Sequence, residues 1–290
     1  MGAEDRAFES LYSENLNKVN LILMALKKNT YHSYHIVDVS PWPLFTSFSA
    51  LIRVFGLAIF MHGFNSGKFC FFFGLMSVLV NVTFWWRDVV REATYEGQHT
   101  IIVRNGLRSG IILFIVSEIM LFFAFFWAYF HSSLNPSPFI GAVWPPEGIE
   151  AMNPWLIPLL NTGLLLTSGA SLTWSHSALL GGYRRESMTS RIITLIFATV
   201  FTLFQVFEYF NAPFCMSDGV YGSTFYLLTG LHGFHVIIGT LFLSVSLYRR
   251  IKYHFTPGVH VGYEAAAWYW HFVDVVWIFL FIVVYIWGGL

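Results

Sequence analysis

Seven long apolar runs constrain this chain more than any other feature of its sequence. Each run is about 20 residues long, the length of α-helix that crosses the hydrocarbon core of a bilayer. Of the 290 residues, 56% are hydrophobic and only 11% are charged, a composition typical of a polytopic membrane protein. The sequence therefore predicts an all-α fold with seven transmembrane helices, within residues 44–63, 69–86, 110–130, 155–175, 191–210, 224–247 and 266–287.

The distribution of Lys and Arg predicts the orientation of the chain, because cationic loops are retained on the cytoplasmic or matrix side. Cations cluster before the first run and in the second, fourth and sixth connections, where the sixth holds Arg249, Arg250 and Lys252. The loops 131–154 and 211–223 hold neither Lys nor Arg. We therefore expect the N-terminus on the inner side of the membrane and the C-terminus on the outer side.

Residues 1–30 differ in character from the rest of the chain. Apolar side chains recur there at helical spacing among acidic and basic ones, which predicts an amphipathic surface helix. A disordered tail is the alternative, because isolated helices of this length are only marginally stable. We therefore divide the chain into an N-terminal extension, residues 1–30, and a seven-helix domain, residues 31–290.

Several ionisable side chains lie inside the predicted spans, where facing lipid costs each roughly 2.5–3.5 kcal/mol. In the last span, Glu264, His271 and Asp274 share one helical arc, so this arc should face protein or water. Glu208 ends the fifth span, and the sequence is compatible with either a buried hydrogen-bonding acid or an acid exposed at the interface. These residues predict a packed helical bundle.

Glu118 is the acid of the third predicted span, and its helical neighbours are apolar. Burial disfavours a charged carboxyl, so we expect Glu118 to be mostly protonated and to react first with a hydrophobic carbodiimide. A proton-handling role and a purely structural hydrogen bond are both open at this residue.

His232 and His235 lie three residues apart on one face of the sixth span. Histidines at such positions ligate metals in some helical bundles, but each would need partner ligands that the sequence does not supply convincingly. Gly230, Gly233 and Gly239 recur at the spacing of closely packed helices. These residues therefore favour two histidines hydrogen-bonded across a helix interface, and a metal site is the alternative.

Aromatic and charged residues gather at the predicted inner membrane boundary. Tryptophan is enriched at headgroup depth, and arginine binds phosphate through paired hydrogen bonds. Phospholipid headgroups are therefore the predicted ligands, and ordinary topology-setting charge is the alternative. The candidate lipid-binding residues are Trp86, Arg91, Glu92 and His99 in the second connection, and Arg249 and Lys252 after the sixth span.

Two classes of function are disfavoured by the sequence. The formal net charge is zero, which argues against nucleic acid as a partner. No nucleotide-binding loop, hydrolase elbow or zinc-ligand spacing occurs, so a self-contained catalytic centre has no support in the sequence.

Many ordered segments of the chain resemble subunit III of the haem-copper oxidases, the cytochrome c oxidase subunit III family. Together these segments extend over roughly residues 31–290, too many ordered polar and aromatic positions for chance similarity between apolar helices. They are Tyr34–Leu44, Trp85–Glu92, Ser117–Glu118, Phe125–Leu134, Trp144–Pro146, Pro158–Thr162, Ser217–Phe225, Thr229–Thr240 and Gly262–Trp277.

The resemblance implies a fold of two bundles, the first two helices and the last five, around a cleft that holds phospholipids. It implies that the chain itself carries no haem, copper or other metal, since these lie in partner subunits. The principal partner would be subunit I, with subunit II and accessory subunits also present. The chain would then stabilise subunit I and support proton uptake while oxygen is reduced to water and protons are translocated.

The resemblance also implies roles for single residues. Glu118 matches the carbodiimide-reactive acid of the family, and the six candidate lipid-binding residues lie in matching motifs, Lys252 least clearly. The chain departs from the family pattern at Gln98, where a histidine is common. This departure weakens the expectation of a proton-collecting group of surface histidines.

The resemblance leaves two alternatives in function and one in location. A subunit III of a quinol oxidase would look similar, because the electron-donor site lies on other chains. An autonomous proton channel using Glu118, Glu208 and Asp274 is the alternative from a different class. The expected location is the mitochondrial inner membrane, with the N-terminus in the matrix and the C-terminus in the intermembrane space, and the bacterial plasma membrane is the alternative.

Overall fold

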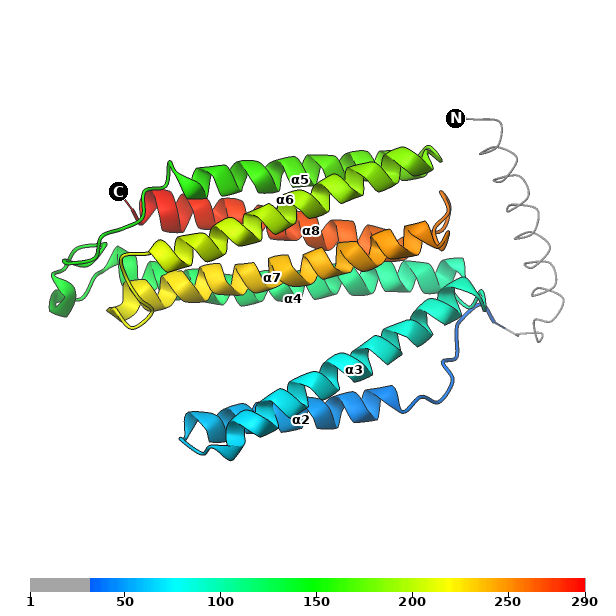
Figure 1. Cartoon of the computed structure of the whole chain (residues 1–290), viewed down its shortest axis with the longest axis horizontal. Coiled ribbons are helices and arrows are strands. Elements are labelled where there is room, and N and C mark those ends of the chain that lie inside the picture. Colours follow the sequence, from blue (N-terminus) through cyan, green and yellow to red (C-terminus); the bar gives the residue numbers. More distant parts are fainter. Residues whose placement is uncertain (1–31, 290) are drawn as a thin grey trace. The chain divides into compact units, whose positions relative to one another are not determined.

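The computed structural model describes residues 32–289, so the amphipathic helix predicted for residues 1–30 lies outside the described residues. The described part is helical, which confirms the predicted all-α class (Figure 1). A 3₁₀ turn, Pro138–Ile140, follows α4, and a π-helical turn, Phe281–Trp287, continues α8. The long helices are α2 (Trp42–Met61), α3 (Ser66–Thr94), α4 (Ile101–Leu134), α5 (Ile157–Leu180), α6 (Arg184–Asn211), α7 (Gly219–Ile251) and α8 (Val261–Leu280).

Each of the seven predicted apolar runs coincides with one of these helices. Six of the helices are long and apolar enough to cross a membrane, and α5 is the exception. Several helices extend well beyond the apolar run, as α3 does by continuing through the charged residues to Thr94. The predicted limits were too short because hydrophobicity ends at the membrane boundary, whereas helical hydrogen bonding continues into the polar region.

Helix α5 has 24 residues and is long enough to span, but its most apolar stretch has a lower hydropathy than those of the other six helices. Its buried positions include Asn161, Ser168, Gly169 and Ser175, which face neighbouring helices. Small and polar residues allow helices in a membrane to approach closely and to hydrogen-bond with each other. The low hydropathy of α5 therefore reflects its buried face.

The described residues fall into two compact units, divided after Gly106. In the first unit, α2 and α3 form a closely packed helical hairpin. Gly56, Gly67 and Gly74 lie directly against the backbone of the opposite helix, where any side chain would clash. Ser49 and Ser77 add a hydrogen bond of 2.7 Å between the two helices. Close backbone packing and a polar contact thus hold this hairpin together.

The second unit, residues 107–290, contains nearly all of α4 together with α5, α6, α7 and α8. Helices α6 and α8 each pack against both α5 and α7. The core of the second unit is rich in large aromatic side chains, among them the fully buried Trp270 and Trp277. Their indole N–H groups donate to Ser168 Oγ and Thr162 Oγ1 of α5, each at 2.9 Å. Hydroxyl groups of α5 thus accept the hydrogen bonds of the buried indole N–H groups of α8.

Candidate functional site

Glu118 of α4 and His235 of α7 form a hydrogen-bonded pair within the second unit. The Glu118 Oε2 atom lies 2.7 Å from His235 Nε2, and the other ring nitrogen, Nδ1, lies 2.7 Å from the Leu231 carbonyl. A carbonyl only accepts, so Nδ1 carries a proton and donates it. A single proton shared between Nε2 and the carboxyl of Glu118 then completes the pair. The structure thus brings together two residues that were predicted separately.

His232, the other histidine of α7, lies in the core. Its Nε2 atom is 3.2 Å from the Val273 carbonyl of α8, so this nitrogen carries the proton and donates it across the interface. Its ring also packs edge-on against Phe201 and beside Trp277. These are the contacts of a residue that links two helices.

Glu208 of α6 is buried, so the interface-exposed alternative is wrong for this chain. It accepts a hydrogen bond of 2.6 Å from the Tyr285 hydroxyl, which lies in the π-helical turn. The sequence left the alternative open because Glu208 lies near the end of an apolar run. Its hydrogen-bond partner, Tyr285, is 77 residues away in the sequence, and no sequence pattern links the two residues.

The predicted arc of α8 has two different environments. Asp274 is buried and lies 3.7 Å from His271, and Gly169 of α5 packs against its carboxylate. The His271 side chain is 44% exposed in this chain. Glu264, one turn into the helix, faces α4 instead. Within this chain the two acids thus face protein, whereas His271 is partly exposed.

Glu264 forms a bidentate ion pair with Arg108 of α4. Arg108 of α4 donates to both carboxylate oxygens, over 2.7 and 3.0 Å. His260, the residue that precedes α8, lies 3.3 Å from Glu264 Oε1, and His176 of α5 lies 3.5 Å from His260. Neither histidine was predicted as a site residue, because the sequence separations range from 4 to 156 residues and match no motif.

The candidate lipid-binding residues of the first unit surround the end of α3. Trp86 is 61% exposed, and Arg91 is exposed as well, as expected of groups that contact lipid. Glu92 and His99 lie beside His35. A carboxylate oxygen of Glu92 and one ring nitrogen of each histidine lie within 4.8 Å of one another. His35 lies in the segment before α2 and was not predicted as part of this group. The structure therefore joins the two ends of the hairpin into one polar cluster.

The other two candidate lipid-binding residues belong to the second unit. Arg249 is partly buried with its guanidinium over the ring of Phe255, and Lys252 is exposed just beyond α7. Burial lowers the pKa of His254, and the neighbouring Arg249 and Lys252 lower it further. At neutral pH this connection therefore owes its positive charge to Arg and Lys.

The structure buries two arginines of the cationic connections that the sequence places on the inner side, Arg191 and Arg250. Arg191 of α6 is fully buried and donates to the Ser246 carbonyl over 3.1 Å, with its guanidinium stacked on Tyr263. Arg250 donates to the Phe255 carbonyl over 2.9 Å. Only the fold reveals carbonyl and aromatic partners of this kind, since neither type of partner has a sequence signature.

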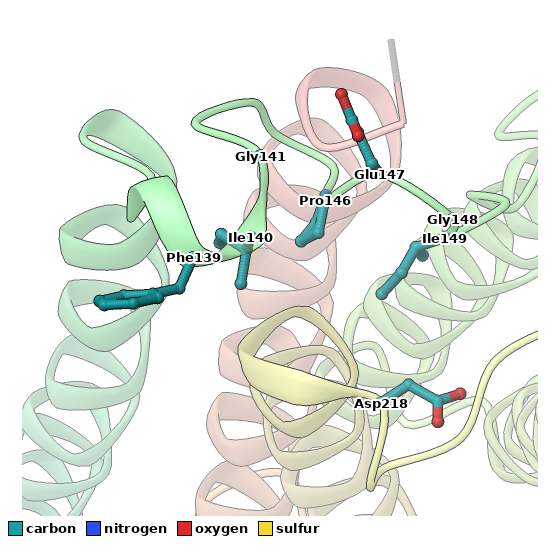
Figure 2. Close-up of a pocket in the computed structure, with 8 residues that line it drawn as sticks. All are labelled: Phe139, Ile140, Gly141, Pro146, Glu147, Gly148, Ile149 and Asp218. Atoms are coloured by element: carbon teal, nitrogen blue, oxygen red, sulfur yellow. The ribbon is translucent and has the colours of Figure 1, made fainter.

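A shallow pocket lies in the loop between α4 and α5, beside the start of α7 (Figure 2). Its lining is mostly apolar or backbone, with Glu147 and Asp218 on opposite sides. Asp218 already accepts from the Cys215 backbone N–H. The pocket thus contains none of the predicted site residues, and its chemistry does not indicate a catalytic centre.

Residues 32–289 match the family described as cytochrome c oxidase subunit III. The chain belongs to this family. Among similar proteins named cytochrome c oxidase subunit 3, that of Prototheca wickerhamii is 57% identical over 258 residues, 89% of this chain and 98% of the relative. That of Arabidopsis thaliana is 56% identical over 89% of this chain and 98% of the relative, and that of Tragelaphus oryx is 52% identical over the same shares.

The subunit III family membership confirms the resemblance that the sequence segments suggested. The matched region coincides with the described residues and includes every candidate site residue named above. The N-terminal extension lies before the match, so its role stays a prediction.

Proposed function

We propose that this chain is subunit III of cytochrome c oxidase, an integral subunit of respiratory complex IV in the mitochondrial inner membrane. The observation that carries the proposal is the family match over residues 32–289, with relatives of that name aligned over nearly their full length. The six apolar helices agree with a multi-pass membrane subunit. The chain thereby takes part in the reduction of oxygen coupled to proton translocation.

The chain itself serves a supporting role in this complex. Its histidines of α7 are engaged with Glu118 and with the Val273 carbonyl, contacts that join helices. The family resemblance implies that haem and copper reside in partner subunits, with subunit I as the principal neighbour. By binding subunit I and phospholipid, the chain stabilises the catalytic subunit and supports proton uptake.

Phospholipid is the small-molecule ligand of the proposal. The family resemblance implies two bundles around a lipid-holding cleft, with the N-terminus in the matrix and the C-terminus in the intermembrane space. In the first unit, exposed Trp86 and Arg91 supply an indole and a cation that suit an anionic headgroup. In the second unit, Arg249 and Lys252 supply further cations.

Purification of the native assembly tests the proposed function. An affinity tag at the C-terminus is expected to recover, in mild detergent, a complex with the absorption spectrum of its haems and with the catalytic subunit in equal amount. An untagged strain processed in parallel is the control for non-specific recovery. Recovery of the chain alone, or with a quinol-oxidising complex, would contradict the assignment.

Carbodiimide labelling tests the special position of Glu118. The Glu118 side chain is 20% exposed, whereas Glu208 and Asp274 are buried, so a hydrophobic carbodiimide reaches Glu118 most easily. We expect Glu118 to be modified first, as read by peptide mass spectrometry, and Glu118→Gln to abolish this modification. Preferential labelling of Glu208 or Asp274 would count against this account.

The autonomous proton channel is less well supported. Glu118, Glu208 and Asp274 lie on three different helices, and each is close to a different partner, namely His235, Tyr285 and His271. A relay would require these acids to share one hydrogen-bonded path. Robust proton flux through vesicles that contain only the purified chain would favour the channel over the supporting subunit.

A further inference from the structure

Three potential metal ligands converge in the second unit, where the end of α5 meets the beginning of α8 (Figure 1). The Nε2 atoms of His176 and His260 are 3.5 Å apart, and His260 Nε2 is 3.3 Å from Glu264 Oε1. All three ligand atoms lie within 4.8 Å of one another. His260 is buried, whereas His176 and Glu264 are partly accessible. The group is therefore rigidly placed and still open to a small ion.

The hydrogen bonds around His260 leave its inward-facing nitrogen as an acceptor. His260 Nδ1 lies 3.1 Å from the Thr256 carbonyl, so Nδ1 carries a proton and donates it. In the neutral ring, Nε2 then presents a lone pair toward Glu264 Oε1, which is also an acceptor. Two lone pairs at 3.3 Å repel each other unless something positive lies between them. Arg108 donates to the same oxygen over 3.0 Å, and a metal cation between the two atoms would use both lone pairs.

We propose that His176, His260 and Glu264 form a binding site for a divalent zinc ion. Zinc–nitrogen bonds of about 2.0–2.1 Å and zinc–oxygen bonds of about 2.0–2.2 Å place tetrahedral ligand atoms roughly 3.4 Å apart. The two separations that involve His260, 3.5 and 3.3 Å, match this spacing, and the His176 and Glu264 atoms lie within 4.8 Å of each other. Two imidazoles and one carboxylate leave a fourth position for water.

The groups behind the ligands support the same assignment. A metal-binding imidazole typically donates its other N–H to a carbonyl, as His260 does to Thr256, which fixes the tautomer that ligates. A ligating carboxylate is typically held by a further hydrogen bond, and Arg108 holds Glu264 with two. Arg108 also neutralises part of the negative charge of Glu264. We therefore expect zinc to bind more weakly here than at a structural zinc site and to exchange with solution.

Zinc binding at this site goes beyond the role of a supporting subunit. It departs from the expectation of no metal site, which rested on the missing partner ligands of His232 and His235 and on the family resemblance. His176 and His260 are 84 residues apart, and His260 and Glu264 are 4 residues apart. No local sequence motif therefore predicts the site. Zinc(II) has no redox chemistry, and the proposal therefore adds no electron-transfer centre to the chain.

Equilibrium dialysis of the native assembly against Zn²⁺ alone tests the site. After chelator treatment, the wild-type assembly is expected to bind one Zn²⁺ more than either His176→Asn or His260→Asn. His62→Asn is the matched control, because His62 is exposed at the end of α2 and belongs to the other unit. It should bind as much Zn²⁺ as the wild type. Equal zinc content in all four assemblies would overturn the proposal.

A second measurement does not depend on whether the variants fold. Anomalous diffraction at the zinc edge, on the wild-type assembly equilibrated with Zn²⁺, is expected to show a peak within bonding distance of both Nε2 atoms and a Glu264 oxygen. A map with zinc elsewhere and none between these three side chains would also overturn the proposal.

Discussion

Replacing Trp270 with alanine is expected to lower the free energy of unfolding by about 3–5 kcal/mol, the range for truncation of a large buried aromatic side chain. Trp270 is completely buried in α8, its ring packs against Gly239 of α7, and its N–H donates to Ser168 of α5. The substitution removes contacts with two helices and leaves the hydroxyl of Ser168 without this donor. Unfolding of the purified assembly in mixed detergent micelles measures the change.

Two further variants distinguish the loss of core packing from the loss of a tryptophan as such. Trp174→Ala removes an indole that is 47% exposed on α5, so a change within about 0.5 kcal/mol is expected. Trp270→Phe keeps much of the ring and loses the hydrogen bond, so its effect should lie between the two. If Trp270→Ala were no more destabilising than Trp174→Ala, the described core of the second unit would be wrong.

Removal of the Arg108 guanidinium is expected to have the second largest effect. Arg108→Leu leaves the Glu264 carboxylate, 12% exposed, without the two hydrogen bonds that hold it. Fully buried pairs lose about 3–5 kcal/mol when one partner is removed. Since Arg108 is 34% exposed, solvent screens part of this loss, and we expect about 2–3 kcal/mol. The same unfolding measurement in micelles reads the change.

The double variant Arg108→Leu with Glu264→Leu provides the internal control. Removing both charges leaves no unpaired carboxylate, so the double variant should be more stable than Arg108→Leu alone. Simple additivity of the two single substitutions would show that the ion pair contributes nothing, contrary to the geometry.

The number and position of the helices were predictable because hydrophobicity is read over about 20 residues at a time. Helix α5 shows where prediction from hydrophobicity alone becomes insufficient. Its buried Asn161, Ser168 and Ser175 lower its hydropathy, although burial is the reason these residues are there. The ends of α3 were also misjudged, because charged residues such as Arg87 and Arg91 continue a helix without being apolar.

Candidate site residues were predictable one at a time, and their partners were not. Glu118 and His235 stood out as ionisable groups within apolar runs, yet nothing in the sequence links them over 117 residues. Arg191 is one of the cations near the fourth connection, and nothing in the sequence predicts that its guanidinium stacks on Tyr263. Only the packing of helices brings such groups together, and one sequence does not encode that packing in any local spacing.

The central claim is that this chain supports an oxidase without carrying its redox centres. Selective removal of the chain from the purified complex, followed by iron and copper analysis of both fractions, tests this claim most directly. The account predicts that all haem iron and copper stay with the remaining complex, whose activity then declines faster during turnover. Iron or copper leaving in stoichiometric amount with the chain would contradict it.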